Sequence, residues 1–179
     1  MEENHDNNNA LYQNMLQLDS FYKSAALLFQ TAREMLIQNF NYIDVRDSRL
    51  AYTYSSAIRR PQEWLPQYLC IYLKHQKKDE YIALTIMLKN PYIPDNKPLE
   101  IFYLYGFKIV SKGETRIDRI CRLAIINPDQ SGIQYSDMGR YTDVKFVDKG
   151  HQCKMVKTNL WEIDNVEKLD RFLKLAVSL

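Results

Sequence analysis

The chain has 179 residues, of which 46% are hydrophobic, 26% are charged and 12% are aromatic. This length can bury a core, and the composition is that of an ordinary globular domain rather than a disordered or fibrous chain. The formal net charge of +2 excludes the strongly basic surface with which dedicated duplex-binding proteins hold phosphates. The sequence contains no uninterrupted apolar run of about 20 residues, which a membrane-spanning helix needs, so we expect no membrane partner.

The first quarter of the chain is predicted to be mostly helical. We expect residues 1–9 to form a flexible polar tail and residues 10–42 to form one long helix, because no proline or glycine interrupts this stretch. Apolar residues recur along it at alternating steps of four and three, the heptad spacing that keeps one side of a helix facing a partner. The members of this heptad seam are Leu11, Met15, Leu18, Tyr22, Ala25, Phe29, Ala32 and Leu36.

The heptad seam has two interpretations. Most amphipathic helices pack on their own domain, and the seam then covers the protein's own sheet. Alternatively, the seam binds a protein partner or a second copy of the chain, and the interface residues are then Leu11, Met15, Leu18, Tyr22 and Phe29. The residues beside the seam are mostly Gln, Asn and Ser, whereas two-stranded coiled coils usually carry charged residues there.

Residues 50–163 are predicted to form a meandering antiparallel sheet of about five to seven strands. Its clearest element is a hairpin in which aliphatic residues alternate with tyrosines and small residues over 68–74 and 81–88. This alternation is typical of antiparallel strands with two different faces. A further strand over 99–110 contains Gly106, which is a candidate bulge.

The segment after this strand is ambiguous. Residues 115–127 fit a helix at one spacing of their apolar residues and a strand at another, and we favour the strand because hairpins lie on both sides. Residues 127–140 contain one proline and two glycines and are predicted to form the longest loop. A last hairpin is expected to pair 141–148 with 152–163.

The chain is predicted to end in a short amphipathic helix at 164–178. Asp164 lies three residues before Glu167, a spacing that resembles a capping box and marks a helix start. Together these elements predict an α+β fold with a long N-terminal helix, an antiparallel sheet and a short C-terminal amphipathic helix. We expect residues 10–179 to form a single domain.

Tyrosine is abundant in the predicted sheet. The alternation places Tyr68, Tyr72 and Tyr81 on one face, with Tyr103 and Tyr105 in the next strand. Exposed aromatic residues on a sheet can stack single-stranded bases, but tyrosine is also common in cores and protein interfaces. Because the chain has no clear basic excess, we favour a core or protein interface and treat nucleic acid as a possible but not favoured partner.

Five arginines are candidates for binding a phosphate or a carboxylate, because the guanidinium group forms paired hydrogen bonds with both. They are Arg59, Arg60, Arg116, Arg119 and Arg122. A solvated surface with local ion pairs is the simpler interpretation of the same residues.

A short acidic pattern resembles a nuclease signature. Pro128-Asp129 is followed by Asp143-Val144-Lys145, which is similar to the P-D…[D/E]-x-K motif of the restriction-endonuclease-like nucleases. The resemblance implies that Asp129 and Asp143 would bind Mg²⁺ or Mn²⁺ and that Lys145 would assist water attack on a phosphodiester. The motif is degenerate and covers fewer than twenty residues, so we favour ordinary surface charges at these positions.

No other sequence motif indicates catalysis. Phosphate-binding glycine loops, nucleophile elbows and zinc-binding helices are absent from the sequence, so we expect no catalytic residues, no cofactor and no metal. The odd number of cysteines, without a C-x-x-C pair, predicts free thiols in the reducing cytoplasm. The leading hypothesis is therefore a non-enzymatic interaction or accessory subunit that uses the heptad seam and the tyrosine-bearing sheet face. A nucleic-acid-directed protein and a small-molecule sensor remain alternatives.

Overall fold

The fold is that of a computed structural model, which describes residues 3–45, 51–52, 68–88, 102–111, 116–126, 133–146 and 151–179. Of residues 3–11, 51–52, 126 and 151 it describes only the backbone. The elements are α1 (Glu3–Phe40), β1 (Tyr42–Asp44), β2 (Ala51–Tyr52), β3 (Tyr68–His75), β4 (Glu80–Met87), β5 (Tyr103–Val110), α2 (Ile117–Ile126), β6 (Ile133–Asp137), β7 (Thr142–Phe146), β8 (His151–Asn159), the 3₁₀ helix η2 (Leu160–Glu162) and α3 (Val166–Ser178). This confirms the predicted α+β class.

The described strands form one antiparallel sheet in the order β1-β3-β4-β5-β8-β7-β6, and the two-residue strand β2 also pairs with β3. The predicted hairpin is present as β3 and β4, with Leu69 opposite Ile86 and Leu73 opposite Ile82. The predicted last hairpin is present as β7 and β8. Alternating aliphatic residues therefore predicted these pairings correctly.

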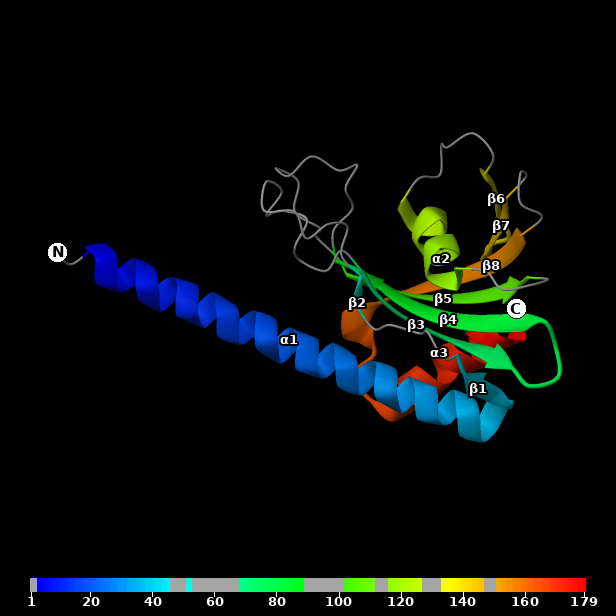
Figure 1. Cartoon of the computed structure of the whole chain (residues 1–179), viewed down its shortest axis with the longest axis horizontal. Coiled ribbons are helices and arrows are strands. Elements are labelled where there is room, and N and C mark those ends of the chain that lie inside the picture. The colour runs from blue at the N-terminus through cyan, green and yellow to red at the C-terminus, as the bar shows by residue number, and fades with distance from the viewer. Residues whose placement is uncertain are drawn as a thin grey trace.

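The helices cover both faces of the sheet (Figure 1). Helices α1 and α3 pack on one face and bury its aliphatic residues, among them Leu84, Leu104 and Val156. Helix α2 packs on the other face, over Cys70, Ala83 and further residues of a second core. Helices thus cover both faces of the central strands. This explains why these strands carry hydrophobic residues on both faces.

The prediction of a strand over 115–127 was wrong, because residues 117–126 form helix α2. Strand β5 is followed in the sheet by β8 rather than by the next strand in the chain. The chain must therefore cross the sheet face before it reaches β6, and the apolar side of α2 covers that face. The predicted loop over 127–140 was also wrong in part, since residues 133–137 form the edge strand β6.

Three helix boundaries differ from the predictions, and one of them is the end of α1 at Phe40 rather than at residue 42. Helix α1 begins at Glu3, so residues 3–9 are helical where a flexible tail was expected. Helix α3 begins at Val166, and its N-cap is Asn165, whose side chain accepts a hydrogen bond from the backbone N–H of Lys168. The cap therefore lies one residue later than the predicted Asp164, whose carboxylate instead pairs with the Lys168 ammonium at 2.7 Å.

Gly106 does not form the predicted bulge, because the pairing of β5 with β4 and with β8 is continuous through it. The residue instead lies where α3 approaches the sheet most closely. A Cβ atom at this position would lie 2.9 Å from Cβ of Ala176 and 3.1 Å from Cζ of Phe172. Glycine is needed here because a side chain would separate α3 from the sheet.

Candidate functional site

The C-terminal half of the heptad seam lies in the protein's own core. Ala25, Phe29, Ala32 and Leu36 are buried against the sheet and α3, and Phe29 is only 2% exposed. Phe29 was predicted as an interface residue, but in this fold no partner can reach it. The interpretation that the seam packs on its own sheet is therefore correct for residues 25–36.

Met15 and Leu18, nearer the N-terminus of the seam, have no such cover. Helix α1 has 38 residues and is about 57 Å long at 1.5 Å per residue, so its first turns extend beyond the edge of the sheet (Figure 1). Met15 is 62% exposed, Leu18 is 43% exposed and Tyr22 is half-buried. The side chain of Leu11 is outside the described residues. We call Met15 and Leu18 the free seam, because Tyr22 packs against the edge of the core.

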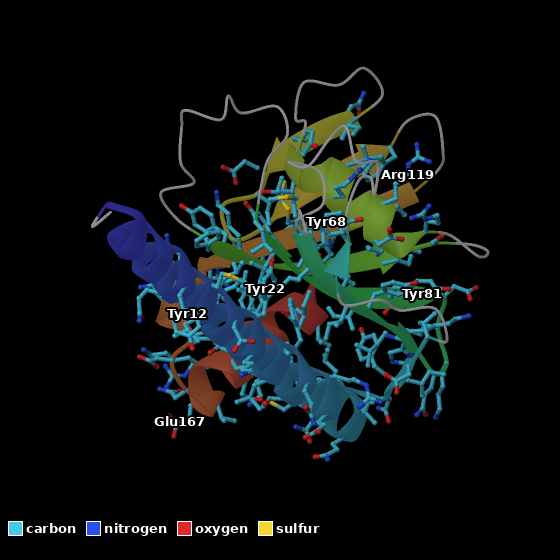
Figure 2. The ribbon with its side chains drawn as sticks, turned by 60° about the vertical axis from the view of Figure 1, so that its left-hand side comes forward. Tyr12, Tyr22, Tyr68, Tyr81, Arg119 and Glu167 are labelled. Atoms are coloured by element: carbon cyan, nitrogen blue, oxygen red, sulfur yellow. The ribbon has the colours of Figure 1, made fainter. Side chains whose placement is uncertain are left out.

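Polar side chains accompany the free seam. Tyr12, labelled in Figure 2 beside the N-terminal half of α1, is exposed on the flank of the seam. Asp19 forms an ion pair with Lys23 at 2.7 Å, and both side chains are more than half exposed. The outer side of α1 carries Leu27, which is 66% exposed. The projecting turns therefore combine several exposed apolar side chains with few charges.

A small apolar groove lies where α1 leaves the sheet, and no sequence pattern predicted it. The rings of Phe21 and Phe102 have centroids 5.8 Å apart, and those of Phe102 and Trp161 are 6.4 Å apart. The adjoining groove, of about 230 Å³, is lined by α1 and by residues around η2, including Leu160 and Trp161. Trp161 is 65% exposed. It lies just after the end of β8, where no sequence pattern indicates an exposed aromatic site.

The tyrosine-bearing sheet face is largely covered. Tyr68, Tyr72 and Tyr81 are buried in the core beneath α2, and Figure 2 shows Tyr68 between the sheet and that helix. Tyr103 and Tyr105 are half-buried, with ring centroids 6.1 Å apart. The expected aromatic interaction surface is thus reduced to these two residues in the sheet, and the other three pack in the core.

The predicted arginine cluster is divided by the fold. Arg59 and Arg60 lie outside the described residues. Arg116 forms an ion pair with Asp118 at 3.1 Å, and this buried carboxylate also accepts a hydrogen bond from the hydroxyl of Tyr68 at 3.3 Å. Arg119, labelled in Figure 2, is exposed on α2, and Arg122 is half-buried on the same helix. Asp118, through the hydroxyl of Tyr68 in β3, therefore connects the start of α2 to the sheet.

The residues of the nuclease-like pattern are only partly placed. Asp129 lies outside the described residues. Asp143 and Lys145 share one face of β7, where the amide of Gln152 donates to the Asp143 carboxylate at 3.3 Å and Lys145 is exposed. Among the described residues, no three His, Cys, Asp or Glu side chains gather in a way that could hold a metal ion.

The three cysteines, which are far apart in the sequence, are all free and lie in the core beneath α2. Thr85 donates a hydrogen bond to the sulfur of Cys70 at 3.3 Å. Burial raises the pKa of the Cys121 thiol, with a further contribution from the neighbouring Cys70, and burial also raises the pKa of Cys153. Such thiols stay protonated and are poor nucleophiles.

A cavity of about 480 Å³ lies at the β6 end of the sheet, with Tyr105, Arg140 and Lys157 in its lining. The hydroxyl of Tyr135 is within hydrogen-bond distance of the carbonyl of Ala124, at 3.3 Å, near the end of α2. Burial raises the pKa of Tyr105 to about 12, with a smaller contribution from Tyr103. The sensor hypothesis would place its ligand in a cavity of this kind.

Comparison with known proteins identifies no relative, because no family model, curated protein or solved structure matches the chain. Among the helices of the described residues, none is both long enough and apolar enough to cross a membrane.

Proposed function

We propose that this chain is a non-enzymatic interaction or accessory subunit that binds a protein helix along the free seam of α1. The observation that carries the proposal is that one heptad seam is buried in one part and exposed in another. Its residues from Ala25 onward are buried by the chain's own sheet, whereas Met15 and Leu18 remain exposed. Heptad spacing fits a helical partner, because residues at this spacing pack against the side chains of a facing helix.

The physical chemistry of a projecting helix supports the same proposal. A helical segment of fewer than about 15 residues is marginal in water unless its apolar side is packed. Residues 4 and 7–9 of α1 are asparagines, which have low helix propensity. A partner helix on the free seam would bury Met15 and Leu18 and would stabilise these turns.

The proposal can be tested by the size of the assembly that contains the chain in extracts of its source cells. We expect the wild-type chain to elute from a sizing column in a species larger than one chain, and Leu18→Asp to elute as a single chain. Leu27→Asp is the matched control, because it introduces the same charge at an exposed leucine on the outer side of α1. The proposal fails if the wild-type chain elutes alone, or if Leu18→Asp leaves the assembly intact.

A further inference from the structure

We infer that the cavity at the β6 end of the sheet binds a small aromatic carboxylate. The cavity has a volume of about 480 Å³, which lies within the range of about 300–1,000 Å³ of pockets that hold small molecules. It lies over β5, β7 and β8, on the face of the sheet that α2 covers, and is separate from the free seam of α1. The inference therefore does not depend on the proposed function.

The floor of the cavity follows from the register of three strands. Tyr105 of β5 lies opposite Lys157 of β8, and Thr142 of β7 lies opposite Met155 of β8. Residues directly opposite each other share a face of the sheet, as do residues two apart in one strand. All four are therefore on one face, and all four line the cavity. The ring of Tyr105 and the thioether of Met155 are both groups that pack favourably against an aromatic ring.

The last turn of α2 and the neighbouring strand β6 form an apolar wall. Ala124 and Ile125 line the cavity from the helix, and β6 lies beside α2 (Figure 1). The hydroxyl of Tyr135 in β6 donates a hydrogen bond to the carbonyl of Ala124 at 3.3 Å. This bond satisfies one of the carbonyl groups that a helix end leaves unpaired. The apolar body of the ligand would therefore lie against this wall.

Two cationic side chains stand at the open side of the cavity. Arg140, in the turn between β6 and β7, and Lys157 both line the cavity and are exposed. Within the described part of the chain neither side chain forms an ion pair, and the Lys157 ammonium lies 4.9 Å from the ring centroid of Tyr103. A guanidinium group presents paired donors that match a carboxylate. Arg140 is therefore the residue that we expect to bind the acid group.

The charge balance favours a ligand with a single negative charge. Asp137 also lines the cavity, and its carboxylate accepts a hydrogen bond from the backbone N–H of Gly139 at 2.8 Å. Two cations and one carboxylate leave one net positive charge, which suits a carboxylate better than a phosphate monoester of about −1.5 to −2.

The hydroxyl of Tyr105 supplies a further donor. It has no hydrogen-bond partner among the described residues. Burial, with a smaller contribution from Tyr103, raises the pKa of Tyr105 to about 12. The phenol therefore stays protonated at neutral pH and can donate a hydrogen bond to a ligand in the cavity.

Ligand-detected NMR titration of the full chain tests the inference. The probes are three aromatic carboxylates (benzoate, 2-naphthoate and indole-3-acetate), the amide of each acid, and inorganic phosphate. We expect at least one carboxylate to bind and its amide to bind about tenfold more weakly or worse, because the amide cannot form charge-assisted hydrogen bonds with the guanidinium. Phosphate should bind more weakly than that carboxylate.

Arg140→Ala should weaken binding of the carboxylate by about tenfold or more and leave binding of the amide unchanged. Tyr105→Phe should weaken it by roughly fivefold, the effect of one neutral hydrogen bond. The matched control is Arg119→Ala, because Arg119 is an exposed arginine of α2 that does not line the cavity. Arg140 is exposed, so its replacement should leave the Tm unchanged, which circular dichroism checks.

The other outcomes overturn the inference. It fails if no carboxylate binds, if the amide binds as well as the acid, or if Arg119→Ala weakens binding as much as Arg140→Ala does. Phosphate binding that Arg140→Ala abolishes, without binding of any carboxylate, would show a phosphate site instead. The proposed function is judged separately, because Leu18→Asp should bind the carboxylate as the wild-type chain does.

Discussion

The contact between α3 and the sheet predicts that Gly106→Ala destabilises the fold and that a second substitution restores part of the loss. The new Cβ would lie 2.9 Å from Cβ of Ala176, well inside the 3.5–4.0 Å optimum for two carbon atoms. Overpacking of this kind costs about 1–3 kcal/mol, and replacement of a strand glycine by alanine returns about 0.5–1 kcal/mol. We therefore expect a net loss of about 1 kcal/mol and at most about 2.5 kcal/mol, or roughly 2–4 °C and at most about 10 °C in Tm for a chain of this size.

The matched test is a double-mutant cycle with Ala176→Gly. This change removes the methyl group that the new Cβ meets, so the double variant should lose less stability than the sum of the two single variants, by about 1 kcal/mol or more. Urea unfolding followed by circular dichroism, at one chain concentration, measures all four free energies of unfolding. Ala32→Gly, at a buried alanine of α1, is the control that should simply add to Gly106→Ala. Additivity with Ala176→Gly within about 0.5 kcal/mol would refute the account of this contact.

Three further predictions concern the seam, pH and metal. Phe29→Ala should lower the free energy of unfolding by about 3–5 kcal/mol, whereas Leu18→Ala should change it by less than about 0.5 kcal/mol in the monomer; equal losses in urea unfolding would contradict the division of the seam. Burial, with a smaller effect of the Glu80 charge, raises the pKa of Tyr42 to about 12. The contribution of the neutral Tyr42 phenol to the free energy of unfolding should therefore be complete below pH 10, the usual tyrosine pKa, and should be lost as pH rises through about 12. In an ultraviolet titration, Tyr42→Phe should lose one of the tyrosines that ionise near pH 12 in the wild-type chain. The same number of such tyrosines in both chains would contradict this prediction. Mg²⁺ or Mn²⁺ should produce neither DNA cleavage nor a melting shift, and cleavage that Asp143→Ala abolishes would instead establish the nuclease alternative.

Local sequence patterns predicted the elements whose neighbours in the sheet are also neighbours in the chain. The β3–β4 and β7–β8 hairpins follow from alternation around a short turn. Helix α2 could not be predicted in the same way, because its apolar spacing fits both a helix and a strand. The choice between them depends on a pairing far away in the sequence, since β8 is the strand that pairs with β5. Strand β6 is short and lies at the edge of the sheet, so its half-buried residues give a weak pattern.

The candidate site was partly visible in the sequence. Heptad spacing identified the seam, but spacing alone cannot indicate where the sheet ends beneath it. The division between Leu18 and Tyr22 is set by the tertiary structure, which buries Phe29, packs Tyr22 against the core and leaves Leu18 exposed. The aromatic residues where α1 leaves the sheet come from three separate segments, and only folding brings Trp161 close to Phe102.

The most direct test of the account is hydrogen–deuterium exchange along α1 in the single chain and in its assembled form, separated by size. In the single chain, we expect amides of residues 12–22 to exchange rapidly and those of residues 25–36 to exchange slowly, because only the second group lies on the packed half of the helix. In the assembled form, residues 12–22 should become protected while residues 25–36 stay unchanged. Rapid exchange over residues 12–22 in the assembled form would contradict the claim that the free seam is the binding surface.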